Sequence, residues 1–121
     1  MEFSDILQGL PDFVQEIATN LRALVRPLHP DIQEDLTKTR TMAGAFYSIG
    51  SKSNVIIFLQ PGDAHCKLYL HHTDKIDTRG LPLQGKGKHA KHIKLFEWDP
   101  ALEDTYRLVL TDITRIVAEK A

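Results

Sequence analysis

The sequence predicts an α+β two-layer sandwich: an antiparallel sheet of four to five strands with an N-terminal and a C-terminal helix packed on one face. Three observations lead to this fold class. Apolar residues recur every three to four positions near both ends of the chain, as in amphipathic helices. The middle is rich in β-branched and aromatic residues divided by short turns. Each predicted helix has a single apolar stripe, so together they can cover only one sheet face.

The first helix is expected over residues 11–28. Its apolar stripe consists of Phe13, Val14, Ile17, Ala18, Leu21, Leu24, Val25 and Leu28. Prolines stand at both ends, where they are tolerated in a first turn or stop a helix. One further helical turn is expected over residues 31–36, because Pro30 and Asp31 favour a helix start. Residues 1–10 are expected to form a short amphipathic lead-in.

Two strands are expected after Thr39, joined by the turn sequence Gly-Ser-Lys-Ser-Asn at 50–54. The second of them, VIIFLQ at 55–60, is a nearly continuous apolar run and is typical of a central strand. Residues 61–63, Pro-Gly-Asp, supply the next turn. Short turns between successive strands predict an antiparallel meander.

A third strand at 65–71 and a fourth at 91–96 alternate between apolar and polar residues, so each has one core face and one open face. The core face is expected to hold Cys66, Leu68, Leu70, Ile93 and Leu95. The open face is expected to hold His65, Lys67, Tyr69, His71, His92, Lys94 and Phe96. A final helix follows Asp99 as cap and Pro100 as first residue. Its stripe consists of Leu102, Tyr106, Val109, Leu110, Ile113, Ile116 and Val117, with Trp98 as a packing plug before it.

A glycine-rich basic loop joins the third and fourth strands. Four lysines and two histidines fall within residues 86–94, and no acid lies between Asp77 and Glu97. Such a backbone can approach an anion closely. We therefore expect a small anionic ligand or an acidic partner to bind the open face and this loop. The predicted ligand-binding residues are Lys67, Tyr69, His71, Lys86, Lys88, His89, His92 and Lys94. The alternative is a solvated lysine-rich turn.

Composition sets the remaining expectations. Residues 1–121 have the length and ordinary composition of one globular domain. Residues 36–96 carry ten bases and three acids, whereas both flanking segments are acidic, so the sheet side is expected to attract anions. No apolar run is long enough to span a membrane and no secretion signal is recognised, which favours the cytoplasm. The single cysteine, Cys66, fits a reducing compartment.

Enzymatic activity, a cofactor and a bound metal are not expected. Cys66 has core-face parity and its neighbour His65 points the other way, so His65 is not placed to activate it. The histidines stand among lysines that repel a divalent cation, and no carboxylate shares their segment. Aromatic residues on the open face could stack bases, but a net charge of −1 is unfavourable for a phosphate backbone, and nucleic acid is not expected as a partner.

Several motifs together resemble one family. They are HPDIQED after the first helix, VIIFLQ, KLYLHH and the GL-x3-GKGK-x5-I loop and strand, over about residues 10–120. The chain resembles the YdhG-like family, small bacterial domains of unknown function that include a frataxin-like iron chaperone. The resemblance implies an α-β-α arrangement with the helices on one sheet face.

Two alternatives to anion binding stay open. Iron binding of the frataxin-like type would use acidic helix surfaces, and the candidates are Glu2, Asp5, Asp12, Glu16, Glu34 and Asp35. A homodimer could instead bury the open face, since Tyr69 and Phe96 are exposed there in this prediction.

Overall fold

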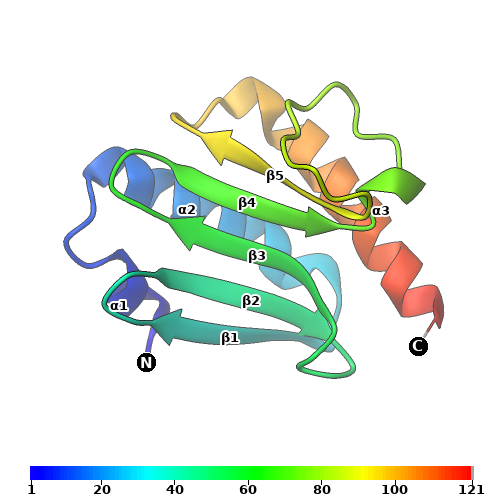
Figure 1. Ribbon diagram of the computed structural model, residues 1–121, viewed down its shortest axis with the longest axis horizontal. Coiled ribbons are helices and arrows are strands. Elements are labelled where there is room, and N and C mark those ends of the chain that lie inside the picture. The colour runs from blue at the N-terminus through cyan, green and yellow to red at the C-terminus, as the bar shows by residue number, and fades with distance from the viewer. Residues whose placement is uncertain (121) are drawn as a thin grey trace.

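The computed structural model describes residues 1–120 and contains a five-stranded antiparallel sheet whose spatial order follows the chain (Figure 1). The strands are β1 (Ile32–Lys38), β2 (Ala43–Ile49), β3 (Val55–Pro61), β4 (Cys66–His71) and β5 (Ala90–Leu95). Each strand pairs with the next one in an antiparallel register. The sheet is therefore a meander with β1 and β5 at its edges, which confirms the predicted α+β class.

The helices lie on one side of this sheet, behind it in the view of Figure 1. They are α1 (Phe3–Leu7), α2 (Asp12–Val25) and α3 (Glu103–Lys120). Three short 3-10 turns join the elements: η1 (Arg26–Leu28), η2 (Thr73–Lys75) and η3 (Pro100–Leu102). The Asp99 carboxylate accepts a hydrogen bond from the Ala101 amide at 3.0 Å. Asp99 is therefore a cap, as predicted, but of the η3 turn that leads into α3 and not of the final helix itself.

The core lies between the helices and the inner sheet face. The inner face of β4 and β5 contributes Cys66, Leu68, Leu70, Ile93 and Leu95, all buried. The helices contribute Val14, Ile17, Ala18, Leu21, Val109, Leu110 and Ile113, also buried. The alternation predicted for the third and fourth strands is therefore confirmed, and no helix within residues 1–120 covers the opposite sheet face (Figure 1). No helix within residues 1–120 has the length and apolar character needed to cross a membrane.

The helical turn predicted for residues 31–36 is wrong, because this segment is strand β1. Ile32, Glu34 and Leu36 lie opposite the buried residues Ile49, Tyr47 and Ala45 of β2, so they belong to the inner face. The apolar–polar alternation of this strand is hard to recognise in the sequence, because its central inward residue is the acid Glu34. Partners from another element compensate that acid, and local sequence does not reveal them.

Two smaller corrections concern the helix stripes. Phe13 is predicted to face the core, but its side chain faces solvent and the residue is 42% exposed. Leu102 lies in η3 rather than in the final helix and is also exposed. Trp98 is half-buried and stacks on Tyr106 with 6.0 Å between ring centroids, which agrees with its predicted packing role.

Candidate functional site

The open face of the sheet carries a row of four rings, one from each of β2 to β5. The register places Phe46 beside Phe58, Phe58 beside Tyr69, and Tyr69 beside His92. Their successive ring centroids are 4.2, 5.6 and 5.1 Å apart. Cross-strand aromatic pairs of this kind stabilise a sheet. We call Phe46, Phe58, Tyr69 and His92 the aromatic row.

Gly44 makes room for this row. A Cβ at position 44 would lie 2.5 Å from Cε1 of the Phe58 ring and 2.8 Å from the Leu59 carbonyl oxygen. Any side chain there would displace the Phe58 ring or the neighbouring strand. Glycine at position 44 therefore allows Phe58 to rest against β2, where it stacks on Phe46.

Two lysines face each other next to the aromatic row. Lys67 of β4 lies directly opposite Lys94 of β5, and Gln60 of β3 lies opposite Lys67 on the other side. Like charges directly opposite each other destabilise a sheet. Within residues 1–120 neither lysine makes an ion pair. We call Gln60, Lys67 and Lys94 the lysine row; two uncompensated positive charges are concentrated in it.

Two imidazoles flank the lysine row and respond to its charge. Partial burial lowers the pKa of His65, and the nearby charges of Lys94 and Lys67 lower it further. Burial, followed by the charges of Lys67, Lys94 and His65, likewise lowers the pKa of His92. Both rings are thus mainly neutral at pH 7. The His65 ring also lies 5.4 Å from the ring of Phe96, which is 62% exposed.

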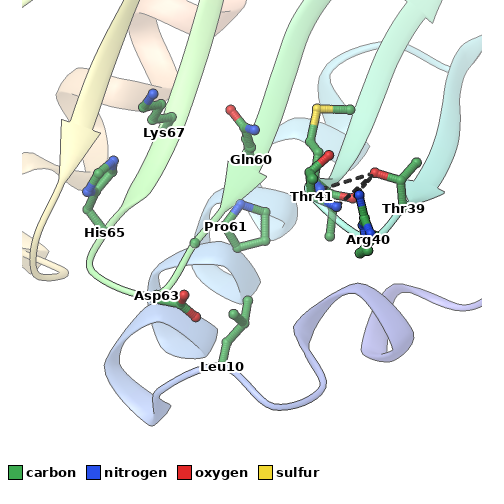
Figure 2. Close-up of a pocket in the computed structure, with 12 residues that line it drawn as sticks. Leu10, Thr39, Arg40, Thr41, Gln60, Pro61, Asp63, His65 and Lys67 are labelled. Atoms are coloured by element: carbon green, nitrogen blue, oxygen red, sulfur yellow. Dashed lines mark hydrogen bonds between the residues drawn. The ribbon is translucent and has the colours of Figure 1, made fainter.

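A pocket of about 330 Å³ opens at the end of the lysine row. Figure 2 shows Gln60, His65 and Lys67 side by side on one flank, and the β1–β2 turn on the other. Thr39 holds that turn: its amide donates to the Met42 carbonyl at 2.7 Å, and its hydroxyl accepts from the Met42 amide at 3.1 Å. The full lining is Leu10, Thr39, Arg40, Thr41, Met42, Ala43, Gln60, Pro61, Gly62, Asp63, His65 and Lys67.

The charges of this pocket favour an anion. Arg40 and Lys67 line it, and the Arg40 guanidinium makes no ion pair within the described part of the chain. Asp63 is the one carboxylate among the described lining residues, and it too makes no ion pair there. With Lys94 opposite Lys67, the positive charges near the pocket outnumber the negative one. The pocket and the lysine row together form the candidate site.

The structure brings together only part of the predicted ligand-binding set. Lys67, Tyr69, His92 and Lys94 lie side by side on the open face, and His71 has the same parity at the end of β4. The loop residues lie elsewhere. Lys88 lines a separate cavity with Lys91, whose parity is that of the inner face, and His89 pairs with Asp74 at 3.0 Å. Lys86 is exposed on the loop and makes no ion pair with a described residue.

Sequence reasoning missed Arg40, Gln60, Phe46 and Phe58. Phe46, Phe58 and Gln60 have open-face parity in β2 and β3, so alternation in the first hairpin could have identified them. Arg40 comes from a turn, and its proximity to Lys67 depends on the β1–β2 and β3–β4 turns meeting at one sheet end. No local pattern encodes that.

The acids considered for iron binding do not form one helical patch. Glu34 and Asp35 lie on β1, where they point to opposite faces. Both Glu34 carboxylate oxygens have protein donors: Arg22 binds each oxygen at 2.8 Å, and the Tyr47 hydroxyl donates to Oε2 at 2.7 Å. Asp5 accepts from the Glu2 amide at 2.7 Å. No group of three or more potential metal ligands occurs within residues 1–120.

The electrostatics of Glu34 agree with this engagement. Burial by itself raises the pKa of Glu34, but hydrogen bonds from Arg22 and Tyr47 and the charges of Arg22 and Arg26 outweigh it, and the pKa is lowered. Burial and the bond to Glu34 raise the pKa of Tyr47.

Cys66 has no reactive thiolate, because burial raises the pKa of its thiol to about 12.

No family model, curated protein or solved structure matches this chain. The function of the candidate site therefore has to follow from its own geometry.

Proposed function

We propose that this domain binds a small anionic molecule in the pocket and along the lysine row, without catalysing its conversion. The observation that carries the proposal is the pairing of Lys67 with Lys94, two like charges held directly opposite each other with no carboxylate partner among the described residues. A fold gains nothing from this arrangement, since opposite charges at these positions would stabilise the sheet. A bound anion would remove the repulsion.

The donors favour a phosphate- or carboxylate-bearing ligand. The planar fork of Arg40 suits such groups geometrically, whereas Lys67 and Lys94 act as point charges. Leu10 and Pro61 offer apolar wall area for the rest of the molecule. A cavity of about 330 Å³ is at the small end of ligand sites, which supports a compact ligand.

The proposal is tested by titrating a panel of small phosphate- and carboxylate-bearing molecules into the ¹⁵N-labelled protein at constant ionic strength. We expect amide shifts at Arg40, His65, Lys67 and Lys94. Lys67→Met, which keeps the aliphatic stem, should weaken binding about tenfold, the loss of one hydrogen bond to a charged group. Arg115→Met removes one positive charge from α3, on the helical side, and should leave binding unchanged. Equal losses in both variants would mean that only net charge matters, and the proposal would be wrong.

An acidic segment of another protein is the second candidate ligand. The exposed Phe96 ring beside His65 supports it, because an apolar contact next to cations suits a peptide better than a compact anion. A homodimer through the same face is less well supported, since it would bring two copies of the lysine row together. Sedimentation at low and high salt distinguishes the acidic segment from the homodimer. A dimer that forms without any added partner or anion would contradict anion binding at this face.

The geometry of the aromatic row is unfavourable for nucleic acid as a ligand of this face. Phe46 and Phe58 stack with 9° between their planes, so the ring faces turned toward each other are occupied. Single-strand binders instead present free ring faces to successive bases. The cytoplasm is the proposed location, supported by an unpaired, buried Cys66 thiol.

A further inference from the structure

A second cavity, away from the open face, opens beside the GKGK loop, which contributes Lys88 to its lining. Its volume is about 300 Å³, and it is lined by Thr73, Asp74, Thr78, Leu81, Leu83, Lys88 and Lys91. Lys91 has the parity of the buried residues Ile93 and Leu95, so the cavity lies on the helix side of β5, at the sheet edge. We call it the loop cavity.

The loop is fixed in place around this cavity by contacts at several points. Gln84 and His92 exchange backbone hydrogen bonds of 2.8 and 2.9 Å, so the loop runs along the free edge of β5. Thr73 donates its amide to the His89 carbonyl at 3.2 Å, which closes the loop at its base. Arg79 forms an ion pair with Asp112 of α3 at 2.9 Å. These contacts preorganise the cavity.

Glycine at position 87 is required for the tight return of the chain toward β5. A Cβ there would lie 2.7 Å from the Ala90 carbonyl oxygen, closer than such atoms approach. The return places Lys88 beside Lys91 at the cavity. Gly87 thus has a structural role, because the tight return that it allows brings Lys88 to the cavity.

The polar groups of the loop cavity are short of acceptors. Lys88 and Lys91 make no ion pair within the described residues. Asp74, the only carboxylate among the described lining residues, is engaged by His89 at 3.0 Å. Thr73 is 6% exposed, and its buried hydroxyl oxygen has no hydrogen-bond partner among the described residues. A buried, unsatisfied hydroxyl costs stability, so its presence on a residue that lines a cavity together with two lysines needs an explanation.

We propose that the loop cavity is a phosphate-binding site in which Lys88, Lys91 and the Thr73 hydroxyl donate to one phosphate group. A tetrahedral phosphate presents several oxygens and can accept from three separate donors at once, which a single carboxylate does less well. This site does not depend on the candidate site of the open face, because the two share none of their lining residues.

The test is a titration of inorganic phosphate into the full-length ¹⁵N-labelled protein at constant ionic strength. Amide shifts should appear at Thr73, Lys88 and Lys91. Lys88→Met, Lys91→Met and Thr73→Val should each raise the dissociation constant about tenfold, the loss of one hydrogen bond to a charged acceptor. Lys52→Met is the matched control: it also removes one lysine charge, but from the turn between β2 and β3, outside both sites, and should leave these shifts unchanged.

Thr73→Val also separates a binding role from a structural one. Because the hydroxyl has no hydrogen-bond partner among the described residues, the variant should be as stable as the parent or more so in phosphate-free denaturant unfolding. Phosphate should then protect the parent more than the variant against unfolding. The proposal is overturned if Thr73→Val binds phosphate as the parent does, if it loses stability without phosphate, or if phosphate shifts only residues of the open face.

Discussion

The two faces of the sheet treat charge in opposite ways. On the covered face Glu34 is 6% exposed at its side chain, yet it receives hydrogen bonds from two arginines and a tyrosine. On the open face Lys67 and Lys94 lie opposite each other, and no acid in the described part of the chain forms an ion pair with either. The buried charge of Glu34 is therefore paired with opposite charges, whereas within residues 1–120 the solvent-accessible charges of Lys67 and Lys94 are not. That difference supports the proposal that the covered face serves stability and the open face serves binding.

The largest test of this comparison removes the buried acid. Glu34→Ala leaves the Tyr47 hydroxyl buried without its acceptor and two arginines without their carboxylate. We expect a loss of about 3 kcal/mol in the free energy of unfolding, near the lower limit for breaking a buried ion pair, because Arg22 and Arg26 stay partly in water. Urea unfolding measures it.

The neighbouring residue provides a matched control. Asp35 points to the open face and makes one 3.4 Å contact with the exposed Lys52. Asp35→Ala should change the free energy of unfolding by less than about 0.5 kcal/mol, as exposed ion pairs do. If the two variants lose similar stability, the contrast between the faces is wrong.

The next effect concerns packing on the open face. Gly44→Ala should lower the free energy of unfolding by about 2 kcal/mol, because the new methyl group collides with the Phe58 ring. In a Phe58→Leu background the same substitution should cost less, since part of the collision is gone. A double-mutant cycle in urea measures this coupling. Additive effects would show that Phe58 does not rest on Gly44 in solution.

The sequence predicted the sheet, the helical layer and the parity of β4 and β5, because these depend on alternation and periodicity within short segments. It failed at β1, where inward Glu34 breaks the apolar alternation and its arginine partners belong to α2 and η1. It also merged the GKGK loop with the open face. Gln84 pairs along the outer edge of β5, and Lys88 lines a cavity on the helix side, a placement that depends on tertiary contacts and not on local pattern.

The pH dependence gives a smaller effect. The pKa values of His65 and His92 are lowered in the folded protein. As the pH falls below about 6.5, the ordinary histidine pKa, the unfolded chain therefore binds more protons than the folded protein does. This part of the stability is present above that pKa and is lost toward acid. Lys67→Met should raise both histidine pKa values, because it removes a charge that lowers them. NMR titration of the ring protons measures this; unchanged pKa values would mean that Lys67 lies far from both rings.

The smallest effect is the most informative. Replacing Lys94 with Met keeps the aliphatic stem and removes the repulsion with Lys67. The free energy of unfolding is measured in urea at low salt and without added anions. For Lys94→Met we expect it to equal that of the parent or to exceed it by up to about 0.5 kcal/mol, and added salt should reduce the difference. A loss of more than about 1 kcal/mol, well outside that range, would show that Lys94 serves the fold, and the open face would then not be a surface kept charged for binding.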